Sequence, residues 1–255
     1  MAAAVSSESS RLRIRLIART EFVPPADVPF ETDAGGGQAL AEFAGRACYQ
    51  SWDRPNPATA TNAGYLRHIL EVGHLSVLEH STATFYLTGI SRAVTHELLR
   101  HRHFSYSELS PRFLPVGGSS VVEPPSVLAD SPLHRRFQVA VDAVAAAHAD
   151  LLAALETAAE HAPDGTVARK QARQLAAGLL PAASETALVM SGNYRAWRHF
   201  IGMRATEAAD VEIRTLAVGV LRQLQGLAPH VFADFRISEL TDGTELAASP
   251  LVADA

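Results

Sequence analysis

The chain has 255 residues, of which 47% are hydrophobic and 19% charged, and its formal net charge at pH 7 is −5. This balance is typical of a folded globular protein and excludes global disorder, which needs low hydrophobicity with a high net charge. The single cysteine, Cys48, excludes an internal disulfide framework and a metal site built from several thiolates.

The spacing of apolar residues and the capping residue types predict the secondary structure. Residues 11–19 alternate charged and apolar side chains, which is the period of a strand with one buried face. In chain order the sequence predicts a strand over 11–19, helices over 38–49 and 60–72, a strand over 82–88, a helix capped by Ser91 and running to about Arg102, a long connection over 115–132, helices over 133–161 and 166–179, a short strand near 186–191, and helices over 194–206 and 210–227. With neither an internal repeat nor a long linker, one α/β domain is expected.

The location of the protein is predicted from what the sequence lacks. No apolar run approaches the roughly 20 residues that span a bilayer. Residues 1–10, MAAAVSSESS, lack the charged and apolar regions of a signal peptide and are expected to be a disordered tail. The net negative charge makes a general affinity for nucleic acid or anionic membranes unexpected. A cytoplasmic protein without membrane or nucleic-acid partners is therefore predicted.

The densest group of reactive side chains lies in the segment Arg100–Arg112, RHRHFSYSELSPR. On the preceding predicted helix, basic side chains at i, i+4, i+8 and i+11 form a cationic stripe along one face: Arg92, His96, Arg100 and His103. Guanidinium forks and serine hydroxyls suit phosphate oxygens, and arginine planes and rings suit flat heterocycles. The alternative, that the cations only offset the helix dipole, explains one or two of them. The segment therefore predicts a site for an anionic ligand.

A second group lies in the predicted helix Asn193–Arg204. Its apolar face repeats at i, i+3, i+4 and i+7, and comprises Trp197, Phe200, Ile201 and Arg204. Arg204 therefore lies on the apolar face. A buried guanidinium has to be paired or hydrogen-bonded, because an isolated buried charge costs several kcal/mol. An internal ion pair with Glu207, Asp210 or Glu212 explains Arg204 equally well. The opposite face carries Arg195, His199 and Gly202.

Several common chemistries are absent from the sequence. His96 and His101 are five residues apart, which turns them roughly 140° from each other on a helix, so they cannot share a metal ion. His74 and His80 are also wrongly spaced, and no metal site is expected. The chain has no G-x-S-x-G elbow, no phosphate loop and no G-x-G-x-x-G fingerprint. Cys48 lies in an apolar stretch without an adjacent base, which favours core packing over catalysis.

One motif resembles a known family. Arg100-His101-Arg102, seven further residues and Ser110 match the R-H-R-x7-S signature of the flavin-dependent thymidylate synthases. The segments Gly73–His80 and Asn193–Arg204 are also similar to that family, and the likeness extends from about Arg11 to Pro250, closest to actinobacterial members. The resemblance implies an α/β (α+β) fold, with a central mainly antiparallel sheet flanked by helices in one domain over 11–250. It also implies a homotetramer with active sites at subunit interfaces.

The resemblance further implies an activity and its residues. Reduced FAD, replenished by NADPH, would supply hydride, and methylenetetrahydrofolate would supply the one-carbon unit placed on C5 of dUMP. Arg204 would be catalytic, because a guanidinium in a dry pocket stabilises the uracil N3 anion without an enzyme thiol. The FAD contacts implied are Ser76, Arg100, His101, Arg102, Asn193, Arg195 and His199. The nucleotide contacts implied are Glu97, Arg100, Glu108, Ser110, Arg112 and Arg204.

Two positions depart from the family's pattern. Ala177 stands where the family usually has an arginine that holds the nucleotide, and Phe113 stands where the signature usually ends in tyrosine. Loss of a charged donor and of a hydroxyl weakens binding of the nucleotide. The charged hydrogen bond alone contributes roughly 1.5–3 kcal/mol. The hypothesis is a uridylate C5-methylase that also accepts or prefers UMP, as in nucleoside-natural-product biosynthesis.

Two other interpretations remain open from the sequence. The arginine and aromatic residues of the two segments could form a platform for single-stranded nucleic acid without catalysis. Bound flavin would distinguish that protein from an enzyme. A flavoprotein oxidase that has lost methyl transfer would consume NADPH and oxygen without making a methylated nucleotide.

Overall fold

The structure, a computed structural model, describes residues 11–54, 56–110, 120–160 and 164–252. Contacts within the chain group into two compact units. The first unit comprises Met1–Arg13, Thr88–Leu98 and Ser107–Leu188, and the second comprises Ile14–Leu87, Leu99–Tyr106 and Val189–Ala255.

A four-stranded sheet has the order β1-β2-β4-β3, built from β1 (Arg13–Arg19), β2 (Thr82–Ser91), β4 (Glu185–Asn193) and β3 (Phe104–Glu108). The Thr20 amide donates to the Thr82 carbonyl (3.1 Å) at one end of β2, whereas Gly89 lies against Arg11 at the other, so β1 and β2 are antiparallel. Gly89 has a φ of +70°, and a Cβ there would lie 2.1 Å from the Arg11 carbonyl oxygen, so this contact requires glycine. The expected class of helices with a mainly antiparallel sheet is confirmed.

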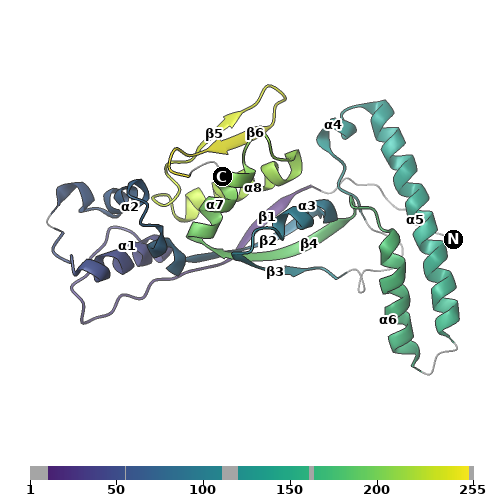
Figure 1. Cartoon of the computed structure of the whole chain (residues 1–255), viewed down its shortest axis with the longest axis horizontal. Coiled ribbons are helices and arrows are strands. Elements are labelled where there is room, and N and C mark those ends of the chain that lie inside the picture. Colours follow the sequence, from purple (N-terminus) through teal and green to yellow (C-terminus); the bar gives the residue numbers. More distant parts are fainter. Residues whose placement is uncertain (1–10, 55, 111–119, 161–163, 253–255) are drawn as a thin grey trace. The chain divides into compact units, whose positions relative to one another are not determined.

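Within its described residues, the second unit carries four α-helices and a hairpin, and Figure 1 shows β5–β6 beside α7 and α8. The elements are α1 (Gly36–Tyr49), α2 (Asn62–Glu71), α7 (Tyr194–Arg204), α8 (Val211–Leu227), β5 (Arg236–Glu239) and β6 (Glu245–Ala248). The core is aromatic: Phe85 meets Trp197 edge to face, with ring centroids 5.1 Å apart. The hairpin was not predicted, since its four-residue strands carry too short a pattern.

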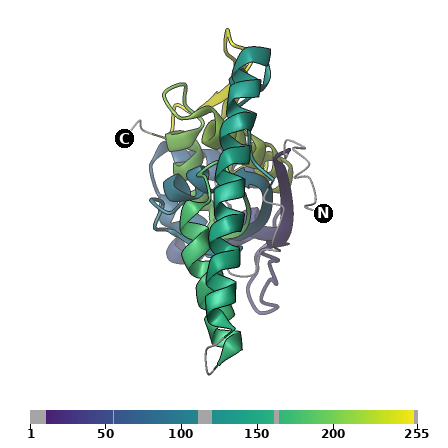
Figure 2. The ribbon, with the colours of Figure 1, turned by 90° about the vertical axis from the view of Figure 1, so that its right-hand side faces the viewer.

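The first unit carries a short helix, α3 (Arg92–Leu98), the turn α4 (Pro125–Leu128), and the long helices α5 (Ser131–Ala159) and α6 (Gly165–Ala176). The two long helices lie side by side in both views (Figures 1 and 2). Although α5 has 29 residues, only Leu152 and Ala159 on it are buried. Most of its alanine-rich surface is therefore open within a single chain.

Helix α5 corrects the expectation that no apolar run approaches membrane-spanning length. It contains an 18-residue window with a mean hydropathy of 1.4, so it is long and apolar enough to cross a membrane by length and composition alone. Only 6% of that window is buried. Its many alanines raise the hydropathy without large apolar side chains, and a single helix of this kind is weak evidence of a span.

Two further predictions are wrong. Helix α3 begins after Ser91, whose Oγ accepts from the Val94 amide (3.1 Å) as expected of a cap, but it ends at Leu98 and not near Arg102. The segment that follows turns and enters β3, because pairing with β4 competes with helix continuation. Cys48, expected in the core, is exposed in the last turn of α1, where its thiol donates to the Ala44 carbonyl (3.3 Å).

Candidate active site

The candidate site in the second unit is centred on a contact between the two segments singled out in the sequence. Arg204 is the last residue of α7, and its Nε donates to Nε2 of His101 at 2.9 Å. His101 lies in the turn between α3 and β3 and is only 8% exposed. The structure therefore brings a residue of the R-H-R signature onto the arginine predicted to be catalytic.

Aromatic rings support this contact. The His101 ring packs edge-on against Phe200, with centroids 5.1 Å apart, and Phe104 packs against Trp197 at 4.6 Å. Gly192 of β4 leaves room for Phe104, since a Cβ there would lie 2.3 Å from its ring. These rings place the histidine on a rigid apolar base.

The imidazole of His101 is neutral at physiological pH. Burial is the main cause that lowers its pKa to about 4, and the electrostatic interactions with Arg204 and His199 contribute to this shift in the same direction. Because Nε2 accepts the hydrogen bond from Arg204, the ring proton of the neutral form belongs on Nδ1. A neutral imidazole does not itself cancel the positive charge of Arg204.

The other residues implied for FAD contact lie in the second unit, and most are exposed. Asn193 caps α7, because its Oδ1 accepts from the Ala196 amide (2.8 Å), and Arg195 pairs with Glu79 at 2.5 Å. The ring of His199 lies 6.2 Å from that of His101. The exposed members of the set are Ser76, Arg100, Arg102, Arg195 and His199.

This donor set fits FAD. Exposed guanidinium, imidazole and hydroxyl groups supply hydrogen-bond donors and positive charge, which a diphosphate needs. The pairing of Glu79 with Arg195 could not be predicted from the sequence, because 116 residues separate them. The sequence analysis also did not predict a role for Tyr106 at this site. Its hydroxyl donates to the His101 carbonyl at 3.0 Å.

The remaining residues implied for the nucleotide belong to the first unit. Glu97 lies on α3, Glu108 ends β3, and Ser110 follows it, half-buried. Arg112 and Phe113 lie outside the described residues. Ala177 is half-buried where α6 ends. Only Arg100 and Arg204 of the nucleotide set belong to the second unit, so a common position for the whole set remains a prediction.

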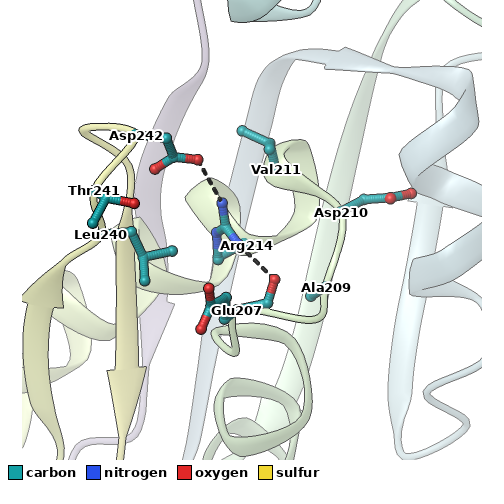
Figure 3. A pocket seen from close by; sticks show the side chains of 8 residues that line it. All are labelled: Glu207, Ala209, Asp210, Val211, Arg214, Leu240, Thr241 and Asp242. Carbon is teal, nitrogen blue, oxygen red and sulfur yellow. Dashed lines mark hydrogen bonds and ion pairs between the residues drawn. The ribbon is translucent and has the colours of Figure 1, made fainter.

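A pocket of about 360 Å³ lies elsewhere in the second unit, at the start of α8 (Figure 3). Its buried arginine, Arg214, donates to the Glu207 carbonyl (2.8 Å) and to Oγ1 of Thr244 (2.7 Å), and lies 3.8 Å from Asp242. Three carboxylates line this pocket, those of Glu207, Asp210 and Asp242. Their negative charge disfavours a nucleotide phosphate, and Arg214 serves to tie the hairpin to α8.

A metal site is not part of this arrangement. Within residues 11–54, 56–110, 120–160 and 164–252, no group of three or more His, Cys, Asp or Glu side chains is placed to hold a metal ion. His96 is exposed, whereas His101 uses Nε2 as an acceptor for Arg204.

Comparison with known proteins places the chain in a family. The sequence profile of the family "Thymidylate synthase complementing protein" matches residues 32–230. A flavin-dependent thymidylate synthase of Mycobacterium sp. (strain JLS) is 61% identical over 253 residues, covering 98% of this chain and 100% of the relative. One from Mycobacterium tuberculosis (strain ATCC 25177 / H37Ra) is 59% identical over 249 residues, with the same coverage.

A solved structure has a similar fold. It is the UMP/dUMP methylase PolB from Streptomyces cacaoi bound with 5-Br dUMP, with a TM-score of 0.63 over 88% of this chain and 94% of that one. At 18% identity, this likeness supports the fold alone. The family profile and the full-length relatives confirm the resemblance seen in the sequence: the chain belongs to the family of the flavin-dependent thymidylate synthases, and it is an enzyme that uses a flavin.

Proposed function

We propose that this protein converts dUMP to dTMP by reductive methylation at C5, with FAD as cofactor and methylenetetrahydrofolate and NADPH as co-substrates. The observation that carries the proposal is the contact between the half-buried Arg204 and the buried, neutral ring of His101. It combines the signature histidine with a guanidinium whose charge the histidine does not neutralise. Full-length relatives at about 60% identity support the same activity.

Arg204 is the catalytic residue of this proposal. Its guanidinium stabilises negative charge that develops on the uracil ring, including at N3, and this charge makes C5 more nucleophilic. Arg204 is half-buried, and such a charge interaction is stronger at a partly buried site than in water. The exposed Cys48 is not needed, because C5 is activated without a covalent bond to the enzyme.

The other residues bind and orient. Glu97, Arg100, Glu108, Ser110 and Arg112 hold the nucleotide together with Arg204. The flavin is held by Ser76, Arg100, His101, Arg102, Asn193, Arg195 and His199. When bound and reduced, FAD supplies the hydride that completes the new methyl group.

The proposed assembly is a cytoplasmic homotetramer of single domains spanning 11–250, with the active sites at subunit interfaces. Helix α5 supports it, because Leu133, Val139 and Leu151 are exposed apolar side chains on a helix with two buried residues. Helix α6 adds exposed Val167 and Leu175. Such a surface is typical of subunit interfaces.

A second candidate substrate is UMP. Ala177 cannot offer the charged donor that the family usually places there, and Phe113 lacks a hydroxyl. A weaker grip on the nucleotide lowers discrimination against the extra 2′-hydroxyl of UMP. The double variant Ala177→Arg with Phe113→Tyr should sharpen the preference for dUMP. Unchanged UMP-to-dUMP selectivity in that variant would refute this explanation.

A product assay by mass spectrometry tests the function. The protein, FAD, NADPH and methylenetetrahydrofolate are mixed with dUMP and UMP in one tube. Formation of dTMP alone supports a thymidylate synthase, and 5-methyl-UMP in addition supports the relaxed pocket. NADPH consumption without a methylated nucleotide would indicate an oxidase, and a protein that binds no FAD would indicate the nucleic-acid platform.

A further inference from the structure

The signature residues Arg100, His101 and Arg102 lie in a short turn, residues 99–103, between α3 and β3. All residues of this turn are described, and of them only His101 is buried. Ordering a free segment when a ligand binds costs free energy, which lowers the affinity. The contacts that already hold the backbone of this turn therefore influence how tightly its side chains can bind a ligand.

Tyr106 of β3 holds this backbone. Its hydroxyl donates to the carbonyl oxygen of His101 at 3.0 Å. The tyrosine ring is half-buried and lies beside the ring of Phe104, with centroids 6.2 Å apart. Phe104 packs against the fully buried Trp197 of α7 at 4.6 Å. The hydroxyl that holds the turn is therefore carried by a strand that is itself packed on the core.

The protonation of Tyr106 suits a permanent hydrogen bond. Burial raises the pKa of the Tyr106 hydroxyl to about 12, so it stays protonated and remains a donor throughout the neutral pH range. The carbonyl oxygen that accepts this hydrogen bond does not titrate. The contact therefore does not change with pH in that range.

The hydrogen bond orients a whole peptide group. The carbonyl of His101 and the amide of Arg102 belong to one planar, trans peptide. The direction of this carbonyl therefore sets the direction of the amide and the position of the Arg102 Cα. The ring of His101 is held as well, because it packs edge-on against Phe200. With both ends of the residue before it fixed, the exposed side chain of Arg102 starts from a fixed point.

We infer that Tyr106 is a positioning residue for FAD, which acts by orienting the peptide between His101 and Arg102 and, through it, the guanidinium of Arg102. This inference rests on the proposed function, in which His101 and Arg102 both contact the flavin cofactor. It adds to the site a residue that acts through the backbone of the signature turn and not through a contact of its own with the cofactor.

A double-mutant cycle between Tyr106 and Arg102 tests this inference. Tyr106→Phe keeps the ring but removes the donor, and Arg102→Gln removes the guanidinium. The full-length single and double variants are titrated with FAD, and dTMP formation then gives the apparent KM for FAD and kcat at saturating FAD. Tyr65→Phe is the matched control, because it removes the hydroxyl of a buried tyrosine on α2. Thermal unfolding of each variant measures any general loss of stability.

We expect Tyr106→Phe to weaken FAD binding by about 5-fold, with kcat at saturating FAD within about 2-fold of the wild type. Arg102→Gln should weaken FAD binding by at least about 10-fold, because a charged hydrogen bond is lost. In the Arg102→Gln background, Tyr106→Phe should change FAD affinity by less than about 2-fold, because the group that it orients is absent. The control Tyr65→Phe should leave FAD affinity unchanged.

Three results would overturn the inference: unchanged FAD affinity in Tyr106→Phe, unchanged FAD affinity in Arg102→Gln, or losses that add fully in the double variant. If Tyr106→Phe does not fold, Tyr106→Met, which fills the space without a donor, is taken through the same cycle. A wild-type protein that shows the expected coupling in FAD binding but methylates no uridylate would support the inference and contradict the proposed function alone.

Discussion

Arg198 and Arg204 lie six residues apart on α7 and are held in opposite ways. Arg198 is 3% exposed, donates to both carboxylate oxygens of Asp234 at 2.6 and 2.7 Å, and donates to the Val231 carbonyl at 2.5 Å. Arg204 donates its Nε to a neutral histidine. In the first case a carboxylate cancels the charge, whereas in the second the imidazole leaves it in place.

This difference separates an arginine that holds the fold from the one proposed to bind the nucleotide. Although burial raises the pKa of Asp234, the hydrogen bonds and charge of Arg198 outweigh it and hold that pKa below its ordinary value. The pair joins α7 to the segment before β5. Removing Asp234, the partner of Arg198, should therefore lower the free energy of unfolding. Removing His101, the partner of Arg204, should instead weaken nucleotide binding.

The largest expected effect comes from breaking the ion pair of Arg198. Asp234→Ala leaves a buried guanidinium without its carboxylate, which should lower the free energy of unfolding by about 3–5 kcal/mol. Urea unfolding of the flavin-loaded protein measures it. The matched control is Glu245→Ala, which breaks the exposed pair with Arg222 (52% and 39% exposed) and should cost less than about 1 kcal/mol. Equal losses in the two variants would refute the structural role of Arg198.

The second prediction concerns the pH dependence that His101 imposes. Its pKa is about 4 when folded but about 6.5 when unfolded, so the unfolded chain binds the additional proton between these values. Its contribution to stability is therefore constant above about pH 6.5 and falls as the pH is lowered towards 4. Between pH 7 and 5 the loss should be about 2 kcal/mol.

His101→Gln removes this titration and serves as the comparison. The free energy of unfolding, measured at several pH values from 7.5 to 4.5, should fall less steeply in His101→Gln than in the wild type. Parallel curves for the two proteins would contradict a buried neutral histidine beside Arg204.

The smallest effect is expected for the third arginine of α7. Arg195 is exposed and pairs with the exposed Glu79, so Arg195→Ala should change the free energy of unfolding by less than about 1 kcal/mol. Its predicted loss is in FAD affinity, by about 10-fold, because a charged hydrogen bond to the cofactor is removed. Glu79→Gln should leave FAD affinity unchanged. If Arg195→Ala lowered the free energy of unfolding as much as Asp234→Ala does, Arg195 would have a structural role like that of Arg198.

The sequence was sufficient for the features with a local pattern. The helix over 194–206 follows from its periodicity, and α7 places Trp197, Phe200 and Ile201 in the core as that pattern requires. The R-H-R signature led to the family because its residues are close in sequence. Cys48 was predicted to lie in the core from its apolar stretch, but it is exposed. An apolar composition does not indicate which side chains at the end of a helix face solvent.

The contacts that define the site were beyond the sequence. His101 and Arg204 are separated by 103 residues, and the sequence indicated only the nearby acids Glu207, Asp210 and Glu212 as candidate partners of the arginine. Their meeting depends on the short α3 and on the pairing of β3 with β4. Pairing of strands distant in the chain is set by tertiary packing, which a single sequence does not reveal.

Steady-state kinetics of Arg204→Gln tests the central claim most directly. With FAD saturating and its content verified, dTMP formation is measured against dUMP concentration for the variant and the wild type. A guanidinium held for the uracil ring predicts that kcat/KM for dUMP falls by at least about 10-fold, with thermal unfolding unchanged. A kcat/KM close to that of the wild type would contradict the account, because Arg204 would then be no more involved in the reaction than Arg198.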